Sequence, residues 1–282
     1  MYRQHFGLSR DIFTCGTDTL WDDGHLTILQ ERFQWLLDSP GIGLLTGEPG
    51  IGKTAALRQL TNKLNPHRYQ VIYTADTDLS RLDFYRHLAL ELGLEPAYHR
   101  AQLWRDIKHK ITLMAEQNQI LIVWVIDEAQ NLPKLFFQDF ASFLNFSFDS
   151  KSLITAWFVG HPNLASILNR APYAHFASRI QVRVRLEPIN DRKRFTDLIQ
   201  NLIQSAGCNQ TLFSDSGVEL MRLASKGNPR KIKHILVTAM RLAVPKDSTI
   251  FQTISSRNLS RHYNEKKLEN QLPLLDSKRP VQ

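Results

Sequence analysis

The chain has 282 residues, of which 43% are hydrophobic and 22% charged, and a formal net charge of +8; these values fit a globular protein with one large and one small domain. The longest apolar run, residues 120–126, is too short to span a membrane, and the polar residues 1–10 contain no apolar core of a signal peptide. The chain has only two cysteines, Cys15 and Cys208, which excludes a disulfide framework and a cysteine-based zinc site. We therefore expect a cytoplasmic protein that does not enter a membrane.

The first predicted elements lead to a phosphate-binding loop. Apolar residues at helical spacing predict a helix over His25–Asp38, and the apolar run Ile42–Thr46 predicts a buried strand. Residues 47–54 then read Gly-Glu-Pro-Gly-Ile-Gly-Lys-Thr, which fits the pattern G-x-x-x-x-G-K-[ST], and the helix formers Ala55–Leu60 follow. The pattern therefore lies between a strand and a helix, and a glycine-rich turn that matches by chance is the less favoured alternative.

This loop predicts the binding of ATP with Mg²⁺. Its three glycines let backbone N–H groups approach the phosphates, and the N-terminus of the following helix adds partial positive charge. Lys53 would contact the β- and γ-phosphates, and the hydroxyl of Thr54 would bind Mg²⁺. The expected cofactor-binding residues are Gly47, Glu48, Pro49, Gly50, Ile51, Gly52, Lys53, Thr54 and Ala55.

Two carboxylates form the second chemical motif. The segment before them is predicted to contain a strand at Tyr69–Tyr73 and helices at Ser80–Leu92 and Arg100–Gln117. The apolar run Ile120–Ile126 then predicts a buried parallel strand, which delivers Asp127 and Glu128 to the sheet edge where α/β proteins bind ligands. Asp127 would hold Mg²⁺, usually through water, and Glu128 would act as the general base for the attacking water. The alternative is a core strand that ends in two solvated acids.

A third strand end carries a histidine. A helix is predicted at Leu135–Asn145, and the apolar segment Ser152–Val159 predicts a strand that ends just before His161. The side chain of His161 could sense the γ-phosphate, whereas a histidine of a surface loop is the alternative. No histidine or cysteine at ligand spacing favours a metal site here. A short helix at Asn163–Asn169 and a strand at Ile180–Leu186 complete this part of the chain.

From residue 188 onward the pattern is helical. Helices are predicted at Asp191–Ala206, Ser214–Ser225 and Arg230–Ala243, with a weak one at Ser256–Glu265. Arg230 lies on the first turn of its helix, from which a guanidinium could reach a phosphate on the neighbouring domain. From Lys231 to the end there are ten Lys or Arg and four Asp or Glu, which fits either a solvated helix face or a phosphate-binding surface. We predict domains at 1–187 and 188–250 and a basic, partly disordered tail at 251–282.

Together these motifs resemble the AAA+ ATPases, and within them the ExeA-like and TniB-like group, over residues 1–250. The resemblance rests on Tyr2 with residues 5–8, on 45–48 before the phosphate loop, and on 126–130, 159–164, 178–180 and 227–230. It implies an α/β fold, a P-loop NTPase core with a five-stranded parallel sheet between helices, followed by a small helical lid. It also implies that the N-terminal segment packs by the adenine, His161 occupies the sensor-one position, Arg179 is the arginine finger and Arg230 the second sensor. The group usually has Gln where this chain has His161.

The resemblance also suggests a biological role. Members of the group are either secretion ATPases of the cell envelope, which carry a membrane segment and a wall-binding region after the ATPase part, or ATP-dependent helpers of DNA transposition. Because neither addition follows the lid here, and because the C-terminal part is basic, we expect the transposition role. Such a protein would bind double-stranded DNA with ATP and Mg²⁺, assemble as a homo-oligomeric ring or filament, and recruit or activate a transposase until hydrolysis releases it; a target-selection protein is a further candidate partner. The alternatives are the secretion role and a nucleotide-switch adaptor that does not bind DNA.

Overall fold

The computed structural model of the chain describes residues 2–10, 12, 21–22, 24–75, 79–146, 152–208, 210 and 212–244. The chain divides into two compact units: Gly16–Pro188, which we call the α/β unit, and Met1–Cys15 together with Ile189–Gln282, which we call the helical unit. The contacts thus group the first fifteen residues with the C-terminal part. The domain limits 1–187, 188–250 and 251–282 stay a prediction, and the predicted helix Ser256–Glu265 and the tail lie outside the described residues.

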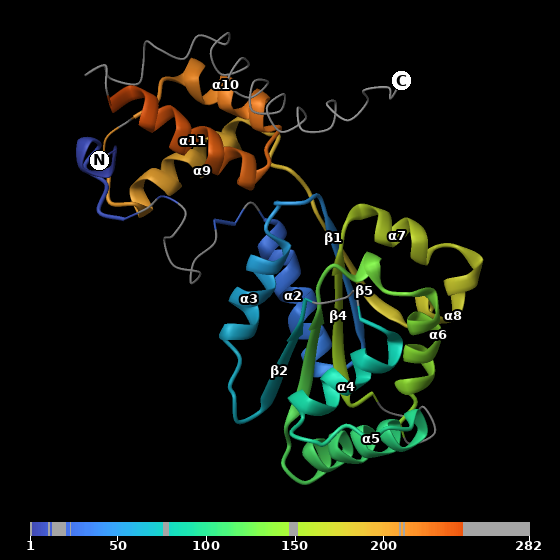
Figure 1. Ribbon diagram of the computed structural model, residues 1–282. Helices are drawn as coiled ribbons and strands as arrows, with labels where there is room; N and C mark the ends of the chain where they lie inside the picture. Colours follow the sequence, from blue (N-terminus) through green and yellow to red (C-terminus); the bar gives the residue numbers. More distant parts are fainter. Residues whose placement is uncertain are drawn as a thin grey trace, which may run out of the picture. The chain divides into compact units, whose positions relative to one another are not determined.

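The α/β unit is built on a parallel sheet of five strands in the order β2-β3-β4-β1-β5 (Figure 1). The strands are β1 (Ile42–Gly47), β2 (Tyr69–Thr74), β3 (Leu121–Ile126), β4 (Ile154–Gly160) and β5 (Ile180–Leu186). The central strands β1 and β4 are buried along their whole length, which is why they appear in the sequence as continuous apolar runs. All five strands predicted from the sequence are confirmed to within two residues at each end.

Helices cover both faces of this sheet (Figure 1). The helices α2 and α3 pack on one face, and α4 to α8 pack on the other. Their bounds are α2 (His25–Asp38), α3 (Lys53–Asn62), α4 (Arg81–Glu91), α5 (Arg100–Glu116), α6 (Lys134–Phe143), α7 (Pro162–Leu168) and α8 (Ala174–Ala177), with short 3₁₀ turns η1 (Ala129–Asn131) and η3 (Ala171–Tyr173). No helix within the described residues has the length and apolar character needed to cross a membrane.

The two faces of the sheet pack into two different cores. In β3, Val123 and Val125 pack with α2 and α3, whereas Trp124 and Ile126 join an aromatic cluster under α4 to α8. Some rings in that cluster meet edge to face, such as those of Phe158 and Phe176, whose centroids lie 5.0 Å apart, and others are tilted or stacked. These two cores hold the strand ends in fixed positions, and the strand ends carry the candidate site.

The helical unit contains α1 (Tyr2–His5), α9 (Arg192–Ser205), α10 (Asp215–Ser225) and α11 (Pro229–Ala243). The three helices predicted after residue 188 are thereby confirmed, and Ser214 caps α10 by accepting a hydrogen bond from the N–H of Gly217. The N-terminal segment belongs to this unit: the N–H and the hydroxyl of Ser9 both donate to the carbonyl of Ala206, at 2.9 and 3.0 Å. The segment therefore satisfies a carbonyl at the C-terminal end of α9 that the helix cannot.

Candidate nucleotide-binding site

The loop of residues 47–54 joins β1 to α3 in the geometry that the sequence predicts. Gly50 and Gly52 have φ angles of 81° and 104°, which favour glycine, and Gly52 forms the N-cap of α3. The helix therefore begins at Lys53, two residues earlier than predicted. At Gly47 a Cβ would lie 2.9 Å from the carbonyl oxygen of Leu186, so the close approach of β5 also requires glycine. The loop can therefore curl with its backbone N–H groups exposed to a ligand.

Lys53 is only 6% exposed although it carries a charge. Its Nζ donates hydrogen bonds to the carbonyl oxygens of Gly47, at 2.8 Å, and Glu48, at 3.2 Å. These carbonyls offset the cost of burying the ammonium group. The positive charge of Lys53 is thus held inside the loop, beside the N-terminus of α3. The ammonium group and the helix N-terminus both attract anions.

Thr54 and Asp127 meet between the loop and the end of β3. The hydroxyl of Thr54 donates to Oδ2 of Asp127 at 2.6 Å, and the hydroxyl of Tyr73 donates to the same oxygen at 3.1 Å. Asp127 is 5% exposed. Partial burial raises the pKa of Tyr73 to about 12, and the negative charge and hydrogen bond of Asp127 add to the effect. Tyr73 therefore stays protonated and remains a donor.

The oxygen atoms of Thr54 and Asp127 suit Mg²⁺. This ion prefers oxygen ligands and usually takes only one or two protein carboxylates, with substrate phosphates and water completing its shell. Among the residues that the structure describes, no group of three or more His, Cys, Asp or Glu side chains could hold a metal ion. Because Thr54 and Asp127 supply two oxygen-bearing side chains, they fit a metal whose remaining ligands include phosphate oxygens.

Glu128 lies in a tight arrangement with residues of two other segments. Its Oε2 accepts a hydrogen bond from Nε2 of Gln130 at 2.6 Å and lies 3.3 Å from Nε2 of His161. The amide oxygen of Gln130 accepts the backbone N–H of His161 at 3.1 Å. Glu128 itself has φ 50° and ψ 35°, a left-handed conformation that costs a non-glycine residue roughly 1 kcal/mol. Its N–H donates to Oδ1 of Asp127 at 2.9 Å, which helps to hold this conformation.

The strand register explains why these residues meet. Thr46 of β1 pairs with Gly160 of β4, and Thr74 of β2 pairs with Ile126 of β3, so the carboxyl ends of neighbouring strands lie at one edge of the sheet. The phosphate loop, the acidic pair and His161 follow directly after these ends. The structure therefore brings together Lys53, Thr54, Asp127, Glu128 and His161, as the sequence predicts.

The structure does not bring Arg179 to this group. Arg179 precedes β5, and the register pairs Ile180 with Ile42 at one end and Leu186 with Gly47 at the other. Arg179 thus lies at the amino end of the sheet, opposite the phosphate loop. Arg230 belongs to the helical unit, where it is exposed on the first turn of α11 and its N–H donates to the capping side chain of Asn228.

Sequence reasoning missed Gln130 and Tyr73. Gln130 directly follows the acidic motif, but only the fold shows that its amide reaches His161, 31 residues later. Tyr73 is the next-to-last residue of β2, which pairs with the strand that ends in Asp127 and Glu128. A tyrosine near the carboxyl end of a predicted strand was the sequence feature that could have indicated its place in the site.

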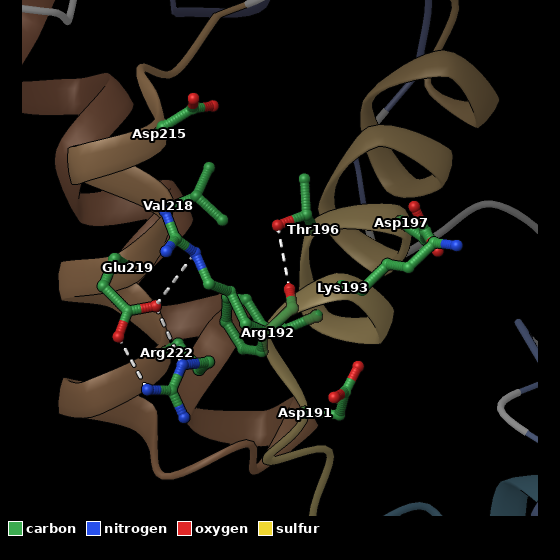
Figure 2. A pocket seen from close by; sticks show the side chains of 10 residues that line it. Asp191, Arg192, Lys193, Thr196, Asp197, Asp215, Val218, Glu219 and Arg222 are labelled. Carbon is green, nitrogen blue, oxygen red and sulfur yellow. Dashed lines mark hydrogen bonds and ion pairs between the residues drawn. The ribbon is translucent and has the colours of Figure 1, made fainter.

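A separate hollow of about 450 Å³ lies in the helical unit between the start of α9 and α10 (Figure 2). Its lining includes Asp191, Asp197, Asp215 and Glu219, which are the four acidic residues of the described part of this unit. Glu219 is paired with Arg222 of its own helix at 2.6 Å and, more distantly, with Arg192 at 4.0 Å. None of the nucleotide-site residues predicted from the sequence lines the hollow.

Comparisons with known proteins agree with the fold. Residues 37–168 match the family model described as "AAA domain". The chain is 27% identical over 259 residues to General secretion pathway protein A of Aeromonas hydrophila; the match covers 88% of this chain but only 46% of that protein's length.

Solved structures share the fold at low sequence identity. Cdc6p of Pyrobaculum aerophilum matches with a TM-score of 0.63 and 16% identity, covering 89% of this chain and 74% of that one. The Aeropyrum pernix ORC1 protein in complex with DNA matches with a TM-score of 0.61 and 17% identity, covering 83% and 64%. The α/β unit followed by a helical region is thus the P-loop AAA+ fold.

Proposed function

We propose that this protein binds ATP and Mg²⁺ at residues 47–54 and hydrolyses ATP to ADP and phosphate. The observation that carries the proposal is the meeting of Lys53, Thr54, Asp127 and Glu128 at the carboxyl ends of β1 and β3. A buried ammonium, a hydroxyl and two carboxylates are the groups that phosphoryl transfer to water requires.

Each side chain has a distinct role in this reaction. Lys53 binds the β- and γ-phosphates, and Thr54 with Asp127 would hold Mg²⁺, which would supply positive charge against the charge that develops on the phosphate oxygens. Glu128 accepts a proton from the attacking water; its side chain is 47% exposed, so water reaches it. His161 follows β4 beside the phosphate loop as a sensor, while Arg179 of a neighbouring subunit and Arg230 of the lid complete the site.

The partner in this proposal is double-stranded DNA, to which the ATP-bound protein binds as a homo-oligomer. The described part of the helical unit carries eleven basic residues against four acidic ones. The basic residues are Arg3, Arg10, Arg192, Lys193, Arg194, Arg222, Lys226, Arg230, Lys231, Lys233 and Arg241. Because the four acidic residues gather at one hollow, the other charged residues of the described part of this unit are basic and suit phosphate contacts. The fold match to an ORC1 protein in complex with DNA adds support.

Within this function, the resemblance of the motifs to the TniB-like group favours a role in DNA transposition, with recruitment or activation of a transposase and with disassembly on hydrolysis. The similarity to General secretion pathway protein A favours a second candidate, an ATPase of secretion that does not bind DNA.

The test compares ATP hydrolysis and DNA binding in the parental protein and in Glu128→Gln. We expect duplex DNA to raise the ATPase rate, and Glu128→Gln to bind ATP and DNA while hydrolysing at least about 100-fold more slowly. Hydrolysis by Glu128→Gln at the parental rate would refute the base assignment. ATPase activity that ignores DNA, together with no ATP-dependent DNA binding, would favour the secretion role.

A further inference from the structure

We propose that Gln130 is a positioning residue for Glu128: its amide ties the carboxylate of the general base to the backbone at the end of β4. The inference rests on the proposed role of Glu128. It assigns a function to a residue that contacts neither phosphate nor metal in the roles described above.

The amide of Gln130 is used at both ends. Its NH₂ group donates to Oε2 of Glu128 at 2.6 Å, and its oxygen accepts the N–H of His161 at 3.1 Å. The reversed orientation would place oxygen against a carboxylate and NH₂ against an N–H donor, so only one orientation satisfies both partners. Gln130 therefore connects the segment after β3 with the first residue after β4.

Glu128 needs such a connection. It has several rotatable side-chain bonds and a half-exposed carboxylate, and its left-handed backbone belongs to no regular helix or strand. The end of β4 is a rigid reference, because Gly160 pairs with Thr46 immediately before the phosphate loop. By joining the carboxylate to this point, Gln130 fixes the distance between the base and the γ-phosphate. A displacement of about 1 Å of a catalytic group can cost 100-fold in rate.

The packing leaves little freedom to the amide. A Cβ at Gly160 would lie 2.5 Å from Oε1 of Gln130 and 2.8 Å from Cδ2 of Leu164. The absence of a side chain at Gly160 is thus what allows Gln130 to reach the N–H of His161. The contact involves the backbone of His161, so it does not depend on the imidazole.

Three variants separate this role from general damage. Gln130→Ala removes both hydrogen bonds, Gln130→Glu keeps the shape but places a second carboxylate against Glu128, and Gly160→Ala displaces the amide without changing it. We expect each to lower kcat about 10- to 100-fold while the dissociation constant of ATP stays within about twofold, because the phosphate loop is unchanged. The matched control is Gln34→Ala: Gln34 also donates to a carboxylate, Asp38 at 3.0 Å, but on the exposed face of α2, and its loss should leave kcat unchanged.

The decisive measurement is a double-mutant cycle in single-turnover hydrolysis. If Gln130 acts through Glu128, then Gln130→Ala should change the residual rate of Glu128→Gln by less than about twofold. A loss that multiplies with that of Glu128→Gln, or a parental kcat in Gln130→Ala, would overturn the inference while leaving the ATPase proposal intact. Parental hydrolysis by Glu128→Gln would instead remove the proposed base and this inference with it.

Discussion

The position of Arg179 predicts that each active site is shared between two subunits. Arg179 precedes β5, whose seven residues span about 20 Å at ~3.3 Å per residue, and Gly47 pairs with the last of them. An arginine side chain cannot cover that distance, so Arg179 cannot reach the phosphate loop of its own α/β unit. In a head-to-tail oligomer the same interface repeats, and an arginine from one subunit can meet the nucleotide of the next.

The perturbation is a pair of inactive variants, Arg179→Ala and Lys53→Ala, mixed in equal amounts. Loss of an arginine finger lowers the rate about 10³- to 10⁵-fold, and loss of Lys53 removes phosphate binding. In random mixed oligomers about one interface in four joins an intact loop to an intact Arg179. ATPase activity should therefore recover to about a quarter of the parental rate per site, which is at least about 100-fold above either variant alone.

A matched control uses two defects of the same half-site. A mixture of Lys53→Ala and Glu128→Gln contains no subunit with an intact loop side, so it should stay inactive at every ratio. Co-assembly is verified by cross-linking differently labelled subunits. If Arg179→Ala and Lys53→Ala co-assemble without recovery, or if the control mixture recovers equally, Arg179 does not act in trans.

Three further outcomes are expected. Tyr73→Phe removes one of two hydroxyl donors to Asp127 and should raise the Mg²⁺ concentration for half-maximal activity several-fold. Because the pKa of Tyr73 is raised to about 12, the phenol stays a donor at both pH 7 and pH 9, and the effect should be equal at the two pH values. An effect that is present at pH 7 and absent at pH 9 would contradict the reasoning. Gly227→Ala should destabilise the helical unit by more than about 1 kcal/mol in thermal unfolding, because Gly227 has φ 67° and a Cβ would lie 2.4 Å from the carbonyl oxygen of Ile189. An unchanged melting temperature would show that the turn relaxes. Lys231→Ala should reduce the slope of log K for DNA against log salt by about 0.9 if Lys231 contacts a phosphate, whereas exposed Arg105 of α5 serves as a comparison whose loss should leave the slope unchanged.

The sequence was most informative where the chemistry is local. The phosphate loop is a contiguous pattern in which glycine at 50 and 52 meets a positive φ and Lys53 opens a helix, so spacing alone predicts its structure. The buried strands were equally clear, because a parallel strand covered on both faces must be apolar throughout. The predicted ends of the strands were correct to within two residues, because turn residues follow where the apolar runs end.

The sequence was least informative where contacts depend on the sheet. Tyr73 and Asp127 are 54 residues apart, and Gln130 and His161 are 31 apart; they meet only because β2, β3 and β4 are neighbours in register. The N-terminal segment shows the same limit. The family resemblance implies that it packs by the adenine, which stays a prediction, whereas the structure shows Ser9 bonded to Ala206 at the end of α9, a contact between residues 197 apart.

The hydrogen bonds around Asp127 bear on its proposed role in binding Mg²⁺. Its Oδ2 accepts from Thr54 and Tyr73, and its Oδ1 accepts from the N–H of Glu128, so three donors compensate a carboxylate that is almost completely buried. The Thr54 hydroxyl donates its single hydrogen to Asp127 in a hydrogen bond, so its oxygen lone pairs remain available to a cation. We therefore propose that Asp127 would act on Mg²⁺ by orienting Thr54 and by its charge. The same geometry distinguishes how the two carboxylates are held. Asp127 is fixed by three hydrogen-bond donors, whereas the proposed base Glu128 is half-exposed to water and depends on Gln130 for its position.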